Sequence, residues 1–227
     1  MAVLNGRAPQ AWLLVAPFFL SNYRIELATL SSISAMRQSP AGWLVGTAVF
    51  ISVSLFLFMI SETLAHLRAL AGGLDPFDIR PIGYDVSEAR AFLEALGATG
   101  RDYYVHVQLR IDALYPATYA FSRVLLILWF ALPGRALARG IAPPYKLVLL
   151  VPPAAACVLD WSENAGIATM LSTWPALPSD LVARTSALTV AKSAASAVTE
   201  SVVIVLLMAT ICHRLMHRRA LRGPTGS

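Results

Sequence analysis

Four long apolar segments restrict the fold of this chain more than any other feature. About 20 helical residues are enough to cross the hydrocarbon core of a bilayer, and segments of at least this length lie at about residues 43–66, 104–132, 146–171 and 187–213. Only 14% of the 227 residues are charged and 57% are hydrophobic, which leaves too little charge to cover a soluble domain. The sequence therefore predicts an all-α fold: a single integral membrane domain over residues 1–227, built as a polytopic bundle of four transmembrane helices.

A further apolar stretch precedes the first span but is too short to cross a membrane. It covers residues 11–20, "AWLLVAPFFL", and is interrupted by Pro17. Only Arg7 precedes it, and the residues after Leu20 form no convincing cleavage site for a signal peptide. We expect an interfacial or re-entrant segment here, continuing to about residue 31.

The distribution of basic residues predicts the orientation. The connection between the second and third spans carries Arg135, Arg139 and Lys146 without an acid, and the C-terminal stretch "HRLMHRRALR" is also basic. The loop between the first and second spans mixes both signs of charge. Because basic loops remain in the cytoplasm, we expect the chain to be integral to the plasma (inner) membrane with both termini on the cytoplasmic side. The net charge of +5 then indicates contact with anionic lipid at the cytoplasmic rim; a chain this apolar is not typical of nucleic-acid binding.

The mixed-charge loop contains a predicted amphipathic helix over about residues 86–97. Asp85 and Glu88 have the spacing of a capping box, and Gly97 is a typical helix end. One face of this helix is apolar and is formed by Val86, Ala89, Phe92, Leu93 and Leu96. The helix either covers the outer end of the bundle as a lid or merely orders the loop.

Polar side chains recur at a similar depth in all four predicted spans. They are Glu62 in the first; Gln108, Asp112, Tyr115 and Tyr119 in the second; Asp160, Glu163 and Asn164 in the third; and Lys192 in the fourth. An ionised side chain at the centre of a bilayer costs about 3 kcal/mol even on permissive scales. We therefore expect these groups to face the interior of the bundle and to form one site in its outer half.

The charges in this predicted site do not balance. Lys192 is the expected counter-charge for Asp112 or Glu163, and the remaining carboxylates should be protonated or bound to a cation. Pro116 removes a backbone donor, so it should free the carbonyl group of Asp112 one turn earlier and kink the second span beside the site.

Part of the sequence resembles a family of small, uncharacterised polytopic membrane proteins. The resemblance covers roughly the middle third of the chain and is carried by three motifs: LGxxGRxxY at residues 96–104, DxxYPxxY at residues 112–119 and DxxEN at residues 160–164. It implies that the three motifs act together. It implies no particular activity.

Three functions are compatible with such a cluster. The first is the binding or passage of a proton or small cation by Asp112, Asp160 and Glu163. The second is an intramembrane enzyme for a lipid or isoprenoid, with a carboxylate as acid or base and Tyr115 or Tyr119 as proton donor.

The third is a subunit of a homo-oligomer or larger membrane complex, in which the polar cluster only fixes helix packing. We expect no metal site and no cofactor. Cys157 and Cys212 lie inside apolar segments and should be packed thiols without a disulfide, and His213 and His217 belong to a basic tail that is more typical of solvated residues than of metal ligands.

Overall fold

All regular secondary structure in the described part of the chain is helical. The computed structural model describes residues 40–131 and 147–221, and contains no strand in these ranges. The predicted interfacial or re-entrant segment at residues 11–31 lies outside them, as does the basic connection that contains Arg135, Arg139 and Lys146.

Among the described residues, three helices are long and apolar enough to cross a membrane. The first, Gly42–Leu70, is continuous through α2 (Gly42–Phe58), the π-helical η1 (Met59–Thr63) and α3 (Leu64–Leu70). The second, Val86–Ala131, comprises α4 (Val86–Tyr103), the π-helical η3 (Tyr104–Gln108), α5 (Leu109–Asp112) and α6 (Tyr115–Ala131). The third, Ser179–Arg218, lies within α9 (Ser179–Leu221).

The remaining predicted span coincides with α8 (Val151–Thr173), a helix of 23 residues that is not among these three candidates. Its length is sufficient for a bilayer. Asp160, Glu163 and Asn164 lie near its middle and reduce its hydropathy. The structure thus establishes an all-helical fold with three candidate membrane-spanning helices.

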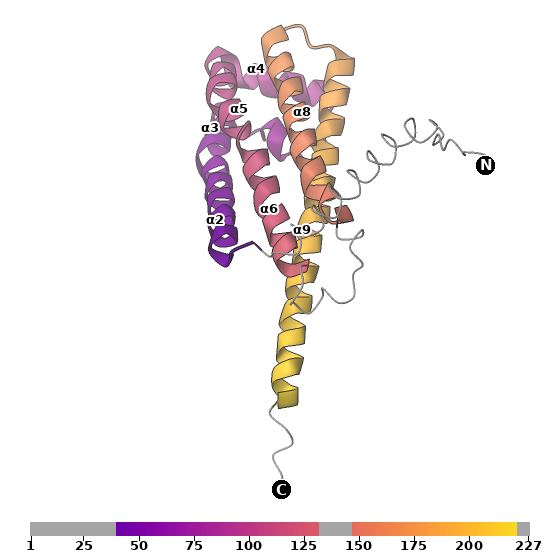
Figure 1. Cartoon of the computed structure of the whole chain (residues 1–227). Helices are drawn as coiled ribbons and strands as arrows, with labels where there is room; N and C mark the ends of the chain where they lie inside the picture. The colour runs from indigo at the N-terminus through magenta and orange to yellow at the C-terminus, as the bar shows by residue number, and fades with distance from the viewer. Residues whose placement is uncertain (1–39, 132–146, 222–227) are drawn as a thin grey trace, which may run out of the picture. The chain divides into compact units, whose positions relative to one another are not determined.

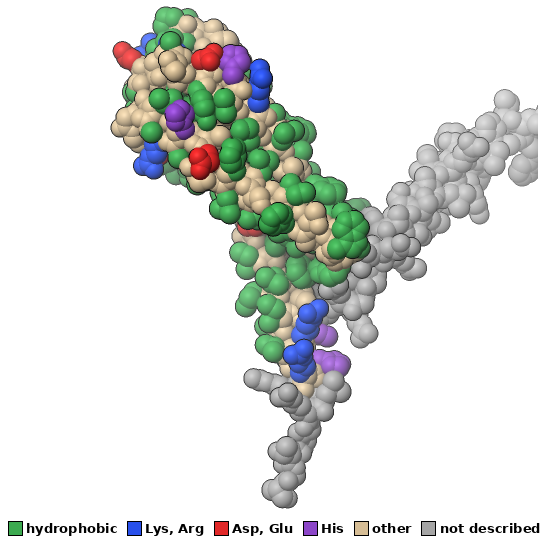
Figure 2. All heavy atoms as spheres, turned by 90° about the vertical axis from the view of Figure 1, so that its left-hand side faces the viewer, with side chains coloured by type: hydrophobic (Ala, Val, Ile, Leu, Met, Phe, Trp, Pro, Cys, Tyr) green, Lys and Arg blue, Asp and Glu red, His purple; other side chains and the backbone are tan. Residues whose placement is uncertain are grey.

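The long helices pack side by side (Figure 1). α8 packs along α9, α2 packs along α6, and α6 also contacts both α8 and α9. Close packing of α8 on α9 depends on Gly166, because a Cβ atom there would collide with the side chain of Thr185. One turn from this contact, Glu163 and Thr189 meet across the same interface. Hydrophobic side chains dominate the middle of the face in Figure 2, whereas charged and histidine side chains gather near α4 and on the last turns of α9.

The predicted amphipathic helix is confirmed as the first part of α4. Asp85 accepts a hydrogen bond from the backbone N–H of Glu88 (2.8 Å), and Glu88 accepts one from that of Asp85 (2.8 Å), so both halves of the capping box are present. The first of these bonds lowers the pKa of Asp85 below its ordinary value. Gly97 has a φ of 62° and interrupts the helix; the helical residues after it lead toward α5 and α6.

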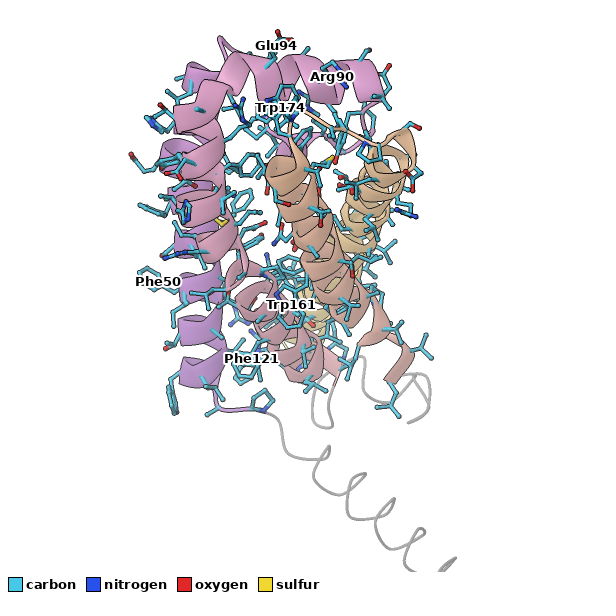
Figure 3. All side chains as sticks on the ribbon, turned by 90° about the horizontal axis from the view of Figure 1, so that it is seen from above. Phe50, Arg90, Glu94, Phe121, Trp161 and Trp174 are labelled. Carbon is cyan, nitrogen blue, oxygen red and sulfur yellow. The ribbon has the colours of Figure 1, made fainter. Side chains whose placement is uncertain are left out.

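The first part of α4 runs across the bundle near one end of the long helices (Figures 1 and 3). Phe77, from the short helix η2 (Phe77–Ile79) in the preceding loop, is fully buried. Its ring contacts those of Tyr84, Phe92 and Tyr104. This aromatic cluster fixes the loop against the bundle and thereby positions Asp78, the next residue.

The predicted kink at Pro116 is also present. Ala113 and Leu114 separate α5 from α6, and the carbonyl groups released there accept hydrogen bonds from side chains of α8. Asn164 Nδ2 donates to the carbonyl oxygen of Asp112 (3.3 Å), and Trp161 Nε1 donates to that of Ala113 (2.9 Å). Two residues of the DxxEN segment therefore hold the broken helix in place.

Candidate functional site

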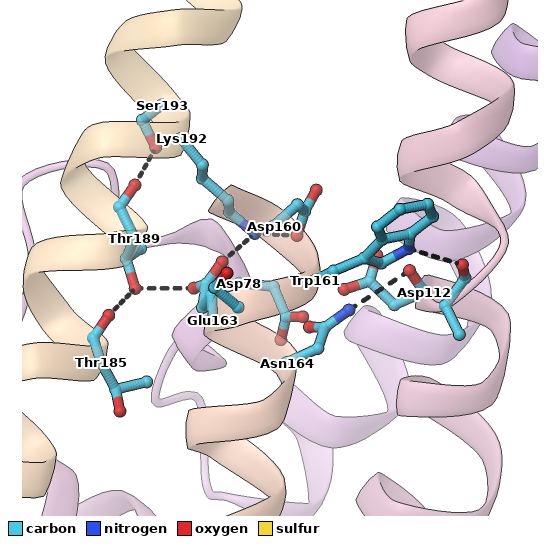
Figure 4. A network of polar contacts seen from close by, with 12 residues as sticks. Asp78, Asp112, Asp160, Trp161, Glu163, Asn164, Thr185, Thr189, Lys192 and Ser193 are labelled. Atoms are coloured by element: carbon cyan, nitrogen blue, oxygen red, sulfur yellow. Dashed lines mark hydrogen bonds and ion pairs between the residues drawn. The ribbon is translucent and has the colours of Figure 1, made fainter. Parts of the chain in front are cut away.

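The centre of the candidate site is Lys192 of α9. Its Nζ lies 2.9 Å from Asp160 Oδ1 and also contacts Glu163 Oε2, so two carboxylates of α8 share one ammonium group (Figure 4). Thr189 donates a hydrogen bond to the other oxygen of Glu163 (2.6 Å). The Glu163 side chain is fully buried, and those of Asp160 and Lys192 are each 12% exposed. The expected pair between Lys192 and Glu163 is present, but the second partner is Asp160, and Asp112 forms no ion pair with the lysine among the described contacts.

Asp112 of α5 is a buried acid with a carboxylate oxygen that is unpaired within the described part of the chain. It is 2% exposed, it borders the cavity described below, and its Oδ2 has no hydrogen-bond partner among the described residues. A carboxylate oxygen in this state loses hydration without compensation, which is costly unless a proton or another ligand is bound.

Asp78 is a second acid with an unpaired oxygen, and the sequence interpretation missed it. Its Oδ2 accepts a hydrogen bond from the hydroxyl group of Tyr104, whereas its Oδ1 is buried without a partner in the described part of the chain. The residue reaches the site from η2 and not from a long helix. Its only sequence signal was an aspartate beside a phenylalanine in a turn-rich loop.

Gln108 and Glu62 lie apart from this group. Gln108 is fully buried and its Oε1 accepts a hydrogen bond from Thr63 (2.5 Å). Glu62 is exposed and does not border the cavity, so the structure does not bring it together with the other predicted residues. The π-helical turn Met59–Thr63 contains one residue more per turn than an α-helix and directs Thr63, not Glu62, toward the second helix.

A second ion pair lies farther along α6 and α9. Arg123 Nε is 2.6 Å from Glu200 Oε1, and the guanidinium group lies over the ring of Tyr119 at 4.9 Å from its centroid. Tyr119 in turn contacts the ring of Tyr115 (6.0 Å between centroids). Arg123 was not among the predicted residues, although its position four residues after Tyr119 places it on the same helical face.

These groups surround a cavity of about 430 Å³. One wall is apolar and belongs to α2 and η1, with Val53, Phe56 and Ile60 among its residues. The opposite wall is polar and contains Asp78, Asp112, Tyr115, Tyr119, Arg123, Asp160, Lys192, Ser193, Ser196 and Glu200. Five of the nine predicted site residues thus line one cavity, Glu163 adjoins it through Lys192, and Asn164 supports the backbone of Asp112.

The described residues do not resemble a metal centre. No group of three or more His, Cys, Asp or Glu side chains in residues 40–131 and 147–221 has an arrangement that could hold a metal ion. Cys157 is buried as expected, whereas Cys212 is exposed on α9, so the prediction that both thiols are packed is wrong for Cys212. His213 and His217 are also exposed.

Comparisons of this chain with protein-family models, with curated proteins and with solved structures found no match.

Proposed function

We propose that the carboxylates at this cavity bind a proton or a small cation and pass it along the bundle. The observation that carries this proposal is the state of Asp112, which lines the cavity and whose buried Oδ2 has no hydrogen-bond partner among the described residues. Lys192 is already shared by Asp160 and Glu163. Asp112 and Asp78 therefore lack a positive partner among the described residues. A bound proton or cation would supply that charge, because neighbouring acids resist carrying full negative charge together.

The polar wall of the cavity supports passage as well as binding. It includes Asp78 of η2, Asp112 of α5, Lys192 with its partner Asp160, and Ser196 and Glu200 of α9. Carboxylates and hydroxyl groups arranged in this way are typical of proton relays in membrane proteins, and water molecules in such a cavity can bridge the gaps between them. In this proposal the proton is exchanged at Asp112.

The test is a flux measurement in vesicles. Purified protein is reconstituted into phosphatidylcholine vesicles containing a pH-sensitive dye, and a potassium diffusion potential drives cations inward. Wild-type protein should acidify the interior faster than protein-free vesicles do. Asp112→Asn should reduce this rate at least tenfold, because the amide cannot exchange the proton at the centre of the path.

The matched control is Glu62→Gln, which removes an exposed carboxylate from the same bundle without touching the cavity. Its flux should equal that of wild type. A wild-type rate no higher than that of empty vesicles would refute passage through this protein.

We propose further that α8 is a fourth membrane span and that the chain lies in the plasma membrane with both termini in the cytoplasm. The exposed basic residues Arg214 and Arg218 near the end of α9 support the cytoplasmic assignment under the positive-inside rule. Single cysteines introduced at Ser87 and Arg214, in a chain with its native cysteines replaced, should react with an impermeant reagent from opposite sides of the membrane. Reaction of both from the same side would contradict this topology.

A further inference from the structure

The cavity has the composition of a site for an amphipathic ligand. Its volume of about 430 Å³ falls within the range of about 300–1,000 Å³ that is usual for small-molecule sites. The apolar wall is not sealed from the surroundings: Val53, Phe56 and Ile60 are 40%, 44% and 40% exposed. These residues belong to α2 and η1, whereas Lys192, Ser193 and Ser196 on the opposite wall belong to α9. Residues of α2 and η1 thus line the cavity and are also partly exposed, so the apolar wall adjoins a surface that lipid chains would contact.

The charges at the polar wall favour a cationic ligand. Of the residues that the structure describes, four carboxylates line the cavity, and both basic side chains that line it are paired: Arg123 with Glu200 and Lys192 with Asp160. Asp78 and Asp112 form no ion pair within the described residues, and each has a buried oxygen without a hydrogen-bond partner there. The site therefore contains two acids without an ion-pair partner among the described residues, and an excess of carboxylates over basic side chains faces the apolar wall.

An alkylammonium group meets these requirements. It carries one positive charge and three N–H donors, and it can offset the negative charge of Asp78 and Asp112, which both line the cavity. The stacked rings of Phe56 and Tyr115, 5.9 Å apart between centroids, border the same cavity and can attract a cation through their faces. The hydrocarbon tail would lie along Val53 and Ile60. A fatty-acid carboxylate would instead meet uncompensated acids.

We propose that this cavity binds a single-chain amphiphile with an ammonium head group, which displaces the proton held at Asp112. This inference rests on the proposed function, because the displaced proton is the one bound there. The exchange is balanced in charge: one ammonium ion enters the site, and one proton leaves it for water. Proton movement along the bundle would then be coupled to the uptake or release of the amphiphile.

Calorimetric titration of the full-length protein in phosphatidylcholine nanodiscs tests this proposal, with dodecylammonium as the probe and empty nanodiscs as the background. Titrations in two buffers of different ionisation enthalpy count the protons released. We expect one saturable site per chain and the release of about one proton per bound probe, as charge balance requires. Dodecanol, which has the same chain but no charge, should bind at least tenfold more weakly.

Two variants locate the site. Val53→Trp fills the apolar wall and should weaken binding of dodecylammonium at least tenfold, whereas Val205→Trp adds the same side chain at an exposed position of α9 that does not line the cavity and should leave binding unchanged. Asp112→Asn should abolish the proton release. Equal binding of dodecanol, or equal effects of the two tryptophan variants, would overturn the inference.

The outcomes also separate this inference from the proposed function. Wild-type protein that acidifies vesicles but shows no saturable dodecylammonium binding would refute the amphiphile and leave the proton site intact. Protein that shows neither property would refute both.

Discussion

Replacing Lys192 with methionine is expected to lower the free energy of unfolding by about 3–5 kcal/mol, the usual cost of removing one partner from a buried ion pair. The ammonium group contacts both Asp160 and Glu163, and none of these side chains is more than 12% exposed. Without the lysine, two carboxylates would remain on one turn of α8 in a low-dielectric environment. Reversible unfolding in mixed micelles measures the difference.

The control variants separate charge from packing. The triple change of Lys192→Met with Asp160→Asn and Glu163→Gln removes the whole charged group and should recover at least half of the lost stability, since contacting residues are not additive. Arg184→Met removes an exposed pair with Asp180 on the same helix and should change stability by at most about 0.5–1 kcal/mol. A Lys192→Met variant as stable as Arg184→Met would show that the buried network does not hold α8 to α9.

The long helices and the capped loop helix could be predicted because their signals are local. Apolar length indicates a helix wherever it occurs, and Asp85, Glu88 and Gly97 mark the ends of the first part of α4 with side-chain and backbone chemistry that acts within a few residues. The pairing of Lys192 with Glu163 could also be predicted. A charged side chain within a membrane is costly, so it needs an oppositely charged partner, and such a partner can come from a neighbouring helix.

The errors arise where the helical period changes or where a loop folds back. Depth alone suggested Glu62, but the π-helical turn at Met59–Thr63 rotates the first helix, and it is Thr63 that contacts Gln108 of the second helix. Asp78 reaches the cavity only because the aromatic cluster around Phe77 holds its loop against the bundle, and such long-range packing leaves no periodic pattern. The same acids that form the site lower the hydropathy of α8, which is why its assignment as a span rests on the proposal above.

Asp112→Asn is expected to remove completely the proton that we assign to the cavity. The amide keeps the size of the side chain and can still form hydrogen bonds, but it cannot take up a proton. Its buried position, at 2% exposure, means that other groups cannot replace it without rearrangement. Stability should hold or improve, because an unpaired buried acid is removed.

The most direct measurement is the infrared spectrum of the protein in lipid at neutral pH, in H₂O and in D₂O. A protonated carboxyl group gives a carbonyl stretching band that shifts on deuteration, and a carboxylate does not. We predict this band in wild-type protein and in Glu62→Gln, and its absence in Asp112→Asn. Identical spectra for wild type and Asp112→Asn would contradict the assignment of a bound proton to this cavity.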